Sequence, residues 1–480
     1  MKPEKLHDAI GMIDDKLIED AKKPRANKKL TVIKWVSSIA AILAIAITLN
    51  FVLYTPLSLP VNAYAISEPE YPERLQCPNI DDYPLDWETY DKLYDEWYEE
   101  KRKIKDTYYG YGKDLDPFFS RSIKEFLSGS ENENKVYSPV NLYMALCMVA
   151  ETVDGNSREQ ILDLLGVDSI ETLRKQANAI WNANYSDDGQ TTSILANSLW
   201  LSQGINYKKN TLDSLAKNYF ASSFSGEMGS KDYNKAFQTW LNEQTGGLLK
   251  DYVKDVEMTP ETVLALASTI YFKASWKNEF LERNTVEDVF YSPNGDVTCE
   301  YMKQGYSRQY YWGDKFSAVE QQLQGSGGMW FILPDEGVSV DELLSDSQAM
   351  DFIFNRGEWE NHKNLIVNLS VPKFDVSSQI KLNDGLKNLG VTDVFDSSVA
   401  DFSPLMENAG GIAVSDSIHA ARVMIDEEGC VATAFTVMHE AGSAAPPTEE
   451  VDFTLNRPFV FVITSNDGLP LFVGAVNNPI

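Results

Sequence analysis

Residues 424–462 form the stretch that most restricts what this chain can fold into. From Gly429 the run reads Cys-Val-Ala-Thr-Ala-Phe-Thr-Val-Met, and it ends in a tip rich in Gly, Ala and Pro at 442–447. Because a strand turns successive side chains to opposite faces, one face of this run carries mostly small side chains and could enter a packed interior. An ordinary strand is rarely followed by such a tip. The residues alone leave two interpretations open: an edge strand with its loop, or a strand that can move into a sheet.

The last part of the chain predicts a buried β-hairpin. Residues 453–463 and 471–476 are two apolar runs, and the turn between them contains Asp467 and Gly468. Asp-Gly is a frequent turn pair between antiparallel strands, and runs without polar alternation are typical of strands buried on both faces.

These two regions resemble the serpin family of serine protease inhibitors. The Asn-Arg-Pro-Phe run at 456–459 and the Leu-Phe-x-Gly-x-Val-x-Asn-Pro ending at 471–479 are similar to serpin signatures. Further similar motifs stand in serpin order upstream, at 136–142, 264–276, 331–334, 371–374, 389–390, 400–403 and 417–419. The resemblance covers about residues 115–480 and implies an α+β serpin fold. Such a fold is expected to have three β-sheets, eight to nine helices and an exposed reactive-centre loop.

The resemblance implies an inhibitor and not an enzyme. A serine protease, or alternatively a cysteine protease, would cut the loop, and the cut loop would insert into the main sheet before the acyl-enzyme is hydrolysed. Serpins are cut about fourteen residues after the hinge glycine, shortly before a Pro-Pro pair, which here indicates the bond Ser443–Ala444. The small, uncharged tip favours an elastase- or subtilisin-like protease over a trypsin-like one.

The resemblance also assigns a hinge and a set of residues that control sheet opening. The hinge residues are Glu427, Glu428, Gly429, Cys430, Val431, Ala432, Thr433 and Ala434. The sheet-opening residues are Ser138, Asn141, Ser268, Trp276, Lys373 and His419, and Lys373 is expected to pair with Glu427 beside Trp276. Cys430, Val431 and Phe435 depart from inhibitory serpins, which usually carry Thr or Ser, an acidic residue and a small residue there. The alternative is therefore a non-inhibitory serpin that acts as a binding protein.

The first 114 residues predict a membrane attachment and a spacer. Residues 35–54 are apolar and long enough to cross the ~30 Å hydrocarbon layer of a bilayer. Basic residues precede this run and acidic ones follow it, so residues 1–34 are expected to be a short cytosolic segment, similar to those of bacterial membrane-anchored regulators, with the rest outside. The alternative is secretion after cleavage near Ala65. Residues 55–114 form an acidic spacer with an aromatic stripe at helical spacing, Trp87, Tyr90, Tyr94 and Trp97, which could dock on a neighbouring domain, a partner or a membrane surface.

Composition excludes several classes of function. A formal net charge of −29 argues against nucleic acid or an anionic polysaccharide as a partner. The four histidines and four cysteines form no catalytic or metal-binding motif, so we expect no cofactor and no metal site. A domain of this size does not need disulfides, so we expect free thiols. We also expect a monomer.

Overall fold

The computed structural model describes residues 60–129, 133–325, 327–414, 417–430 and 447–480. The predicted cytosolic segment 1–34, the predicted membrane span 35–54 and the bond Ser443–Ala444 lie outside these ranges. No helix within them is both long and apolar enough to span a bilayer. Residues 59–480 form one compact unit.

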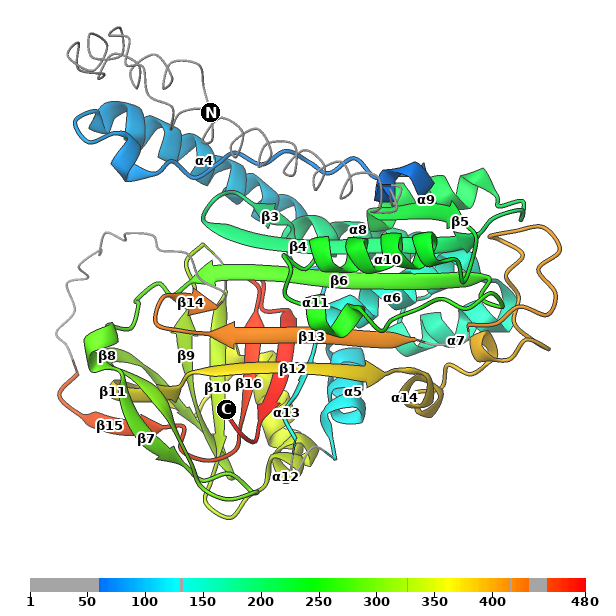
Figure 1. Ribbon diagram of the computed structural model, residues 1–480. Coiled ribbons are helices and arrows are strands. Elements are labelled where there is room, and N and C mark those ends of the chain that lie inside the picture. Colours follow the sequence, from blue (N-terminus) through cyan, green and yellow to red (C-terminus); the bar gives the residue numbers. More distant parts are fainter. Residues whose placement is uncertain (1–59, 130–132, 326, 415–416, 431–446) are drawn as a thin grey trace, which may run out of the picture. The chain divides into compact units, whose positions relative to one another are not determined.

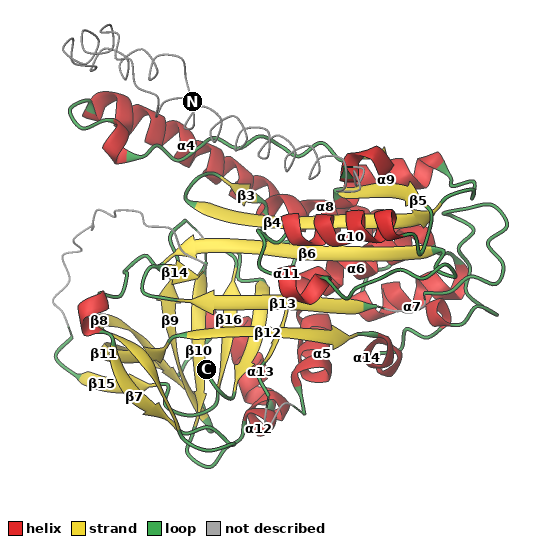
Figure 2. Ribbon diagram, viewed as in Figure 1, coloured by secondary structure: helices red, strands yellow, loops and turns green. Residues whose placement is uncertain are grey.

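The main sheet has eight strands, in the order β1-β5-β4-β6-β14-β13-β12 with β3 paired to β4 (Figures 1 and 2). The pairing of β4 with β5 is parallel, and β6 runs antiparallel to β4 along its length. The bounds are β1 (Ala65–Ser67), β3 (Ser186–Asp187), β4 (Thr191–Ser202), β5 (Ala221–Gly226), β6 (Leu264–Ser275), β12 (Phe374–Lys381), β13 (Ile418–Ile425) and β14 (Gly429–Cys430).

A second network holds the other nine described strands, in the order β15-β11-β8-β9-β10-β16-β17-β2 with β7 paired to β8. The bounds are β2 (Lys135–Tyr137), β7 (Val286–Phe290), β8 (Val297–Trp312), β9 (Phe316–Gln322), β10 (Gly328–Pro334), β11 (His362–Pro372), β15 (Glu450–Thr454), β16 (Phe459–Thr464) and β17 (Pro470–Val476). The expected three separate sheets were therefore wrong in their connectivity. Strand β8 pairs with β7 and β11, and its last three residues also pair with β9, so two sheets merge into one.

The described residues contain eleven α-helices and six short 3₁₀ helices. The α-helices are α4 (Trp87–Tyr108), α5 (Asp116–Leu127), α6 (Pro139–Thr152), α7 (Gly155–Leu165), α8 (Ile170–Asn184), α9 (Lys209–Tyr219), α10 (Lys231–Glu243), α11 (Lys250–Val253), α12 (Val340–Ser345), α13 (Ser347–Asn355) and α14 (Asn383–Asn388). The 3₁₀ helices are η1 (Val61–Tyr64), η2 (Ile80–Asp82), η3 (Lys113–Leu115), η4 (Glu282–Asn284), η5 (Arg356–Glu358) and η6 (Asp393–Phe395). The expected eight to nine helices were too few, because α11, α12 and α14 have six residues or fewer and lack a full amphipathic pattern, and α4 precedes the region of resemblance.

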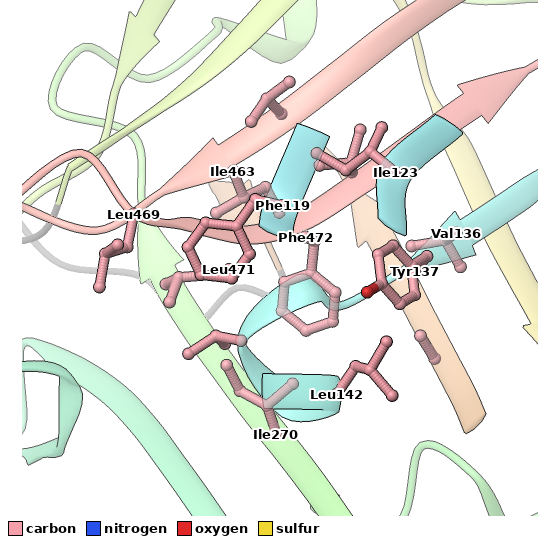
Figure 3. Packing of buried hydrophobic residues seen from close by; sticks show 14 of the residues in the cluster. Phe119, Ile123, Val136, Tyr137, Leu142, Ile270, Ile463, Leu469, Leu471 and Phe472 are labelled. Atoms are coloured by element: carbon pink, nitrogen blue, oxygen red, sulfur yellow. The ribbon is translucent and has the colours of Figure 1, made fainter. Parts of the chain in front are cut away.

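The core lies where α5 and α6 pack between the two sheets. Helix α6 is apolar on nearly all sides, begins at Pro139, and is capped by the Ser138 hydroxyl, which accepts a hydrogen bond from the Asn141 backbone N–H. It contacts β6 of the main sheet and β17 of the second network. Figure 3 shows the side chains that meet there: Phe119, Ile123, Val136, Tyr137, Leu142, Ile270, Ile463, Leu469, Leu471 and Phe472. The predicted hairpin is confirmed, since β16 and β17 pair antiparallel, are buried throughout and turn at Gly468, whose φ of +86° suits glycine.

The spacer is built into the main sheet. Strand β1 pairs antiparallel with β5 and adds an edge strand, while Tyr64 packs its ring 5.0 Å from that of Tyr233 on α10. Downstream, the Asp188 carboxylate accepts a hydrogen bond from Trp97 Nε1 at 3.2 Å and pairs with Lys101 Nζ at 2.8 Å. The Cys77 backbone N–H donates to the Asp188 carbonyl at 2.7 Å. The predicted aromatic helix therefore docks on the rest of the molecule through its later half.

The N-terminal segment joins the main sheet at the end far from β14. Ala65 lies opposite Phe224, which is level with Trp200 on β4 and Ala265 on β6. At the other end of β6, Ala274 lies opposite Cys430 of β14. Pro60 and the hinge are thus at opposite ends of the same sheet.

Candidate functional site: the hinge and the opening of the main sheet

The first hinge residues already lie inside the main sheet. As β14, Gly429 pairs with Ser275 and Cys430 pairs with both Ala274 on β6 and Ile425 on β13. The Cys430 side chain is only 2% exposed. A Cβ on Gly429 would come within 2.4 Å of the Ala274 carbonyl oxygen, so the close approach of the two strands requires glycine here.

A turn built on Asp426 directs the hinge into this position. The Asp426 carboxylate accepts hydrogen bonds from the backbone N–H groups of Glu428 and Gly429, at 3.0 and 3.1 Å. The buried Trp276 holds the turn from the other side: its Nε1 donates to the Asp426 carbonyl at 2.8 Å, and its backbone N–H donates to the Glu428 carbonyl at 2.9 Å. Asp426 was missed from the sequence, although an Asp three residues before a Gly is a frequent turn signal.

Lys373 and Glu427 meet beside Trp276, as expected. Lys373 Nζ lies 2.8 Å from Glu427 Oε1, which also accepts a hydrogen bond from the Thr285 hydroxyl at 2.7 Å. Glu300 adds a second carboxylate 3.3 Å from Lys373 Nζ. Burial lowers the pKa of Lys373 and raises that of Glu427, but the hydrogen bonds outweigh burial, so the net pKa of Lys373 is raised and that of Glu427 is lowered. Nothing in the sequence indicated Thr285 or Glu300, which come from η4–β7 and β8.

Beyond β14, no strand pairing joins the two halves of the main sheet in the part of the chain that the structure describes. Strand β6 is fully paired with β4 on one edge, and β13 is fully paired with β12. In the described residues the only link between β6 and β13 in the sheet order is the two-residue β14. The facing edges of β6 and β13 thus present backbone groups that an inserted strand could satisfy.

Four of the predicted sheet-opening residues form a cluster beneath this gap, the opening cluster: Ser138, Asn141, Ser268 and His419. The Ser138 backbone N–H donates to His419 Nε2 at 3.0 Å, and Asn141 Nδ2 donates to the Ser268 carbonyl oxygen at 3.5 Å. Burial lowers the pKa of His419 to about 4, so the ring is neutral and Nε2 accepts. The cluster borders a cavity of about 60 Å³.

The opening cluster is not fully satisfied. Within the described structure, Asn141 Oδ1 and the Ser268 hydroxyl are buried without a hydrogen-bond partner. The Asn141 amide reaches the Ser268 backbone carbonyl, at 3.5 Å, and not the Ser268 hydroxyl. Buried polar atoms without partners destabilise the state that contains them.

The remaining predicted site residues, Val431, Ala432, Thr433 and Ala434, lie outside the described residues. All four cysteines are described, as separate thiols. The described part of the chain contains no group of three or more His, Cys, Asp or Glu side chains placed to hold a metal ion.

Comparison with known proteins decides the family. The family model described as "Serpin (serine protease inhibitor)" matches residues 116–479, three quarters of the chain. This chain belongs to the serpin family. Serpins are mostly protease inhibitors, some are non-inhibitory binding proteins, and they are not catalysts. The described hinge and opening cluster lie within the matched range.

Individual relatives agree over the same part of the chain. Human leukocyte elastase inhibitor is 30% identical over 368 residues, covering 74% of this chain and 96% of that protein. Tengpin, a thermophilic serpin solved in its native state, is 26% identical with a TM-score of 0.67, covering 76% of this chain and 93% of tengpin. Thyroxine-binding globulin, solved in complex with thyroxine, is 22% identical with a TM-score of 0.64, covering 77% and 99%, and shows the fold alone. The serpin domain is thus matched nearly end to end, whereas the first 115 residues lie outside the family match.

Proposed function

We propose that this serpin inhibits an elastase- or subtilisin-like serine protease, by cleavage of its reactive loop and insertion of the cut loop between β6 and β13. The observation that carries the proposal is β14, because two hinge residues already occupy the first positions of an additional strand. The relative named leukocyte elastase inhibitor supports the class of protease.

The register of β14 can be extended along the gap. Cys430 pairs with Ala274 and Ile425, and for each further loop residue the partner on either strand moves back by one in antiparallel pairing. Residues on the side of Cys430 would then meet the core side of the sheet: Ala432 beside Phe272 and Val423, Ala434 beside Ile270 and Ala421, and Thr436 beside Ser268 and His419. Small side chains at these positions fit between buried neighbours.

This register gives Thr436 and Phe435 a physical interpretation. Thr436 would bring a hydroxyl to the opening cluster, where Ser268 and Asn141 hold buried polar atoms without partners, so insertion would relieve a cost present in the intact protein. Phe435 would fall opposite Thr269 and Ala420, on the other face of the sheet, where Ala420 packs against a second buried cluster.

The chemistry belongs to the protease. Its serine Oγ bonds to the carbonyl carbon of Ser443, the bond to the Ala444 nitrogen breaks, and the protease histidine delivers the proton to the leaving amine. The serpin contributes the rate of loop insertion, because the loop must insert before water hydrolyses the ester.

A second candidate function is a binding protein without inhibition. The hinge favours it, since Cys430, Val431 and Phe435 depart from the residues usual in inhibitory serpins. Thyroxine-binding globulin, with the same fold, is a relative that binds a small ligand.

One experiment separates the two functions. The purified chain is incubated with elastase- and subtilisin-like proteases, and the products are resolved in SDS and by mass spectrometry. Inhibition predicts an SDS-stable complex and a cut at Ser443–Ala444, and a Ser443→Arg variant should gain inhibition of trypsin because its primary pocket is acidic. Turnover of the loop without any complex would refute inhibition and favour the binding protein.

We further propose that residues 35–54 hold the serpin domain on the outer face of a membrane. The alternative cleavage near Ala65 would remove η1 and cut into β1, losing the packing of Tyr64 on Tyr233 and part of the pairing with β5. Surface digestion of intact cells, with the mass of the mature N-terminus, tests this: a membrane-bound chain that keeps its first residues supports the anchor, and a released chain beginning near residue 66 contradicts it.

A further inference from the structure

The aromatic stripe on α4 is only partly used in packing. Trp97 is 4% exposed and bound to Asp188, but Trp87 and Tyr98 are 49% and 56% exposed, and Leu85 just before the helix is 95% exposed. The rings of Trp87, Tyr90, Tyr94 and Trp97 form a continuous series, with successive centroids 6.3, 6.0 and 5.2 Å apart. We call the exposed residues Trp87, Tyr94 and Tyr98 the aromatic ladder. Exposed apolar groups gathered on one element are typical of interaction surfaces.

The ladder projects from the hinge end of the molecule. The docked part of α4 binds Asp188, which precedes β4, and Thr191 at the start of β4 pairs with Ala274, the partner of Cys430. Trp87 lies ten residues before Trp97 along the helix, about 15 Å farther out. In Figure 1 the N-terminal half of α4 extends beyond the β3–β4 end of the main sheet, toward the side on which β14 lies.

The projecting half of α4 is also distinct in charge. Residues 86–96 contain five carboxylates and one lysine, whereas residues 97–108 contain three carboxylates and four basic residues. Carboxylates at a helix N-terminus stabilise the helix through its dipole, so the charge alone indicates no site. The exposed rings are the second observation, because the helix does not require them and Trp87, Tyr94 and Tyr98 are 49%, 37% and 56% exposed.

Acidic groups interleaved with exposed rings suit a basic partner surface. Arginine and lysine side chains can pair with the carboxylates and also lie over the faces of Trp and Tyr rings. A second copy of this chain is a poor occupant, since it would bring two negatively charged ladders together, and anionic lipid would be repelled for the same reason.

We propose that the aromatic ladder is a docking surface for the target protease, which it contacts through basic residues beside the protease active site while the reactive loop occupies that active site. This proposal rests on the proposed inhibitory function. A protease domain of about 230 residues is roughly 45 Å across, wide enough to touch the loop and a helix that projects from the same end. The ladder would select among proteases that accept the same small loop residues, by adding a contact that the loop does not provide.

Docking of this kind acts on association. The ladder should raise the rate of encounter with a basic protease, and the gain should shrink as salt rises, because steering between exposed charges is screened. Neither the position of the cut nor the stability of the final complex should change.

The test uses the full chain and measures the second-order rate constant for loop cleavage by several elastase- and subtilisin-like proteases of different surface charge. Two variants remove the ladder's rings or charges: Trp87→Ala/Tyr94→Ala and Asp91→Asn/Asp95→Asn. Tyr111→Ala is the matched control, because Tyr111 is an exposed aromatic residue beyond the docked end of α4. Circular dichroism melting curves identify any variant that fails to fold.

For at least one basic protease, both ladder variants should lower the rate constant by about tenfold and flatten its salt dependence, while Tyr111→Ala matches the wild type. Cleavage of a free peptide with the loop sequence should not discriminate in this way. Equal rate constants and equal salt dependence for all three variants would overturn the ladder, even if covalent complexes form. If the loop is cleaved but no complex forms, inhibition is refuted, and the rate constants of the variants still decide whether the ladder binds the protease. If no protease cuts the loop, both proposals are refuted.

Discussion

Protonation of His419 would break the hydrogen bond that its Nε2 accepts from Ser138. The ring has a pKa of about 4 in the folded protein, against about 6.5 in an unfolded chain. As the pH falls below about 6.5, the unfolded chain takes up the proton first, so stability is lost progressively until the pH reaches about 4. The loss attributable to this residue is up to about 3 kcal/mol.

Denaturant unfolding between pH 7.5 and 4.5 checks this prediction. A His419→Gln variant should lose stability less steeply over that range than the wild type, because glutamine does not titrate. His362→Gln is the control for replacing a histidine at an exposed position. Identical slopes for wild type and His419→Gln would contradict a buried neutral histidine.

We expect the ion pair between Lys373 and Glu427 to keep the hinge end of the gap between β6 and β13 closed. Replacing Glu427 with Gln leaves the Lys373 ammonium with Glu300 alone, and should cost about 1–3 kcal/mol while freeing the turn at Asp426. We expect the intact variant to convert faster than the wild type to a heat-resistant form with the loop inserted. Conversion is followed by the loss of inhibitory activity at constant temperature, and a rate equal to that of the wild type would show that the pair does not control opening.

At the scale of elements, helix α4 of the spacer is attached to the end of the main sheet where β3 and β4 meet. Lys101 pairs with Asp188, whose side chain is 3% exposed, and also donates to the Gly325 carbonyl at 3.1 Å, so one side chain links α4, the β3–β4 turn and the β9–β10 turn. Replacing Lys101 with Met leaves a buried carboxylate without its cation and should destabilise the protein by about 2–4 kcal/mol.

The matched control for this prediction is Lys103→Met, on the exposed side of the same helix. In urea unfolding, the free energies of unfolding of the two variants should differ by the whole loss expected for Lys101→Met, since Lys103 has no comparable buried partner among the described residues. Equal midpoints would mean that α4 is only loosely attached.

At the scale of the whole molecule, the intact fold should be less stable than the cut one. Insertion would supply a strand to two facing edges that the described structure leaves joined only by β14, and in the proposed register it would bring Thr436 to the unsatisfied opening cluster. Cleavage within 440–446 should therefore raise the thermal midpoint by on the order of 20 °C. Calorimetry of the intact and the cleaved chain measures the difference, and a lower midpoint after cleavage would exclude insertion.

Local signals in the sequence were enough for much of this architecture. The hairpin at β16–β17 was predictable because an Asp-Gly turn and continuous apolar runs lie within a short stretch of chain. The Lys373–Glu427 contact could be placed only through the family resemblance, since 54 residues separate the two positions. The merging of two sheets through the last residues of β8 could not be predicted, because it depends on where distant strands end.

The candidate site shows the same division. Hinge positions followed from the resemblance, but the insertion of Gly429 and Cys430 depends on the spacing of β6 and β13, which no local pattern encodes. The partners of Asp188 come from residues 77, 97 and 101, about ninety residues earlier in the chain, so the docking of α4 was open from the sequence.

Because Pro60 and the hinge lie at opposite ends of the main sheet, an inserting loop would move from the hinge toward the N-terminal segment. A loop that zips down beside β6 from Cys430 moves its severed end toward Leu264, the end of the sheet at which the N-terminal segment enters. A protease esterified to that severed end would move with it toward the same end of the sheet. If residues 35–54 are rooted in a membrane, the enzyme would finish its journey close to the surface of the cell that made the serpin. The inhibited protease would then stay attached to the membrane of that cell instead of diffusing away.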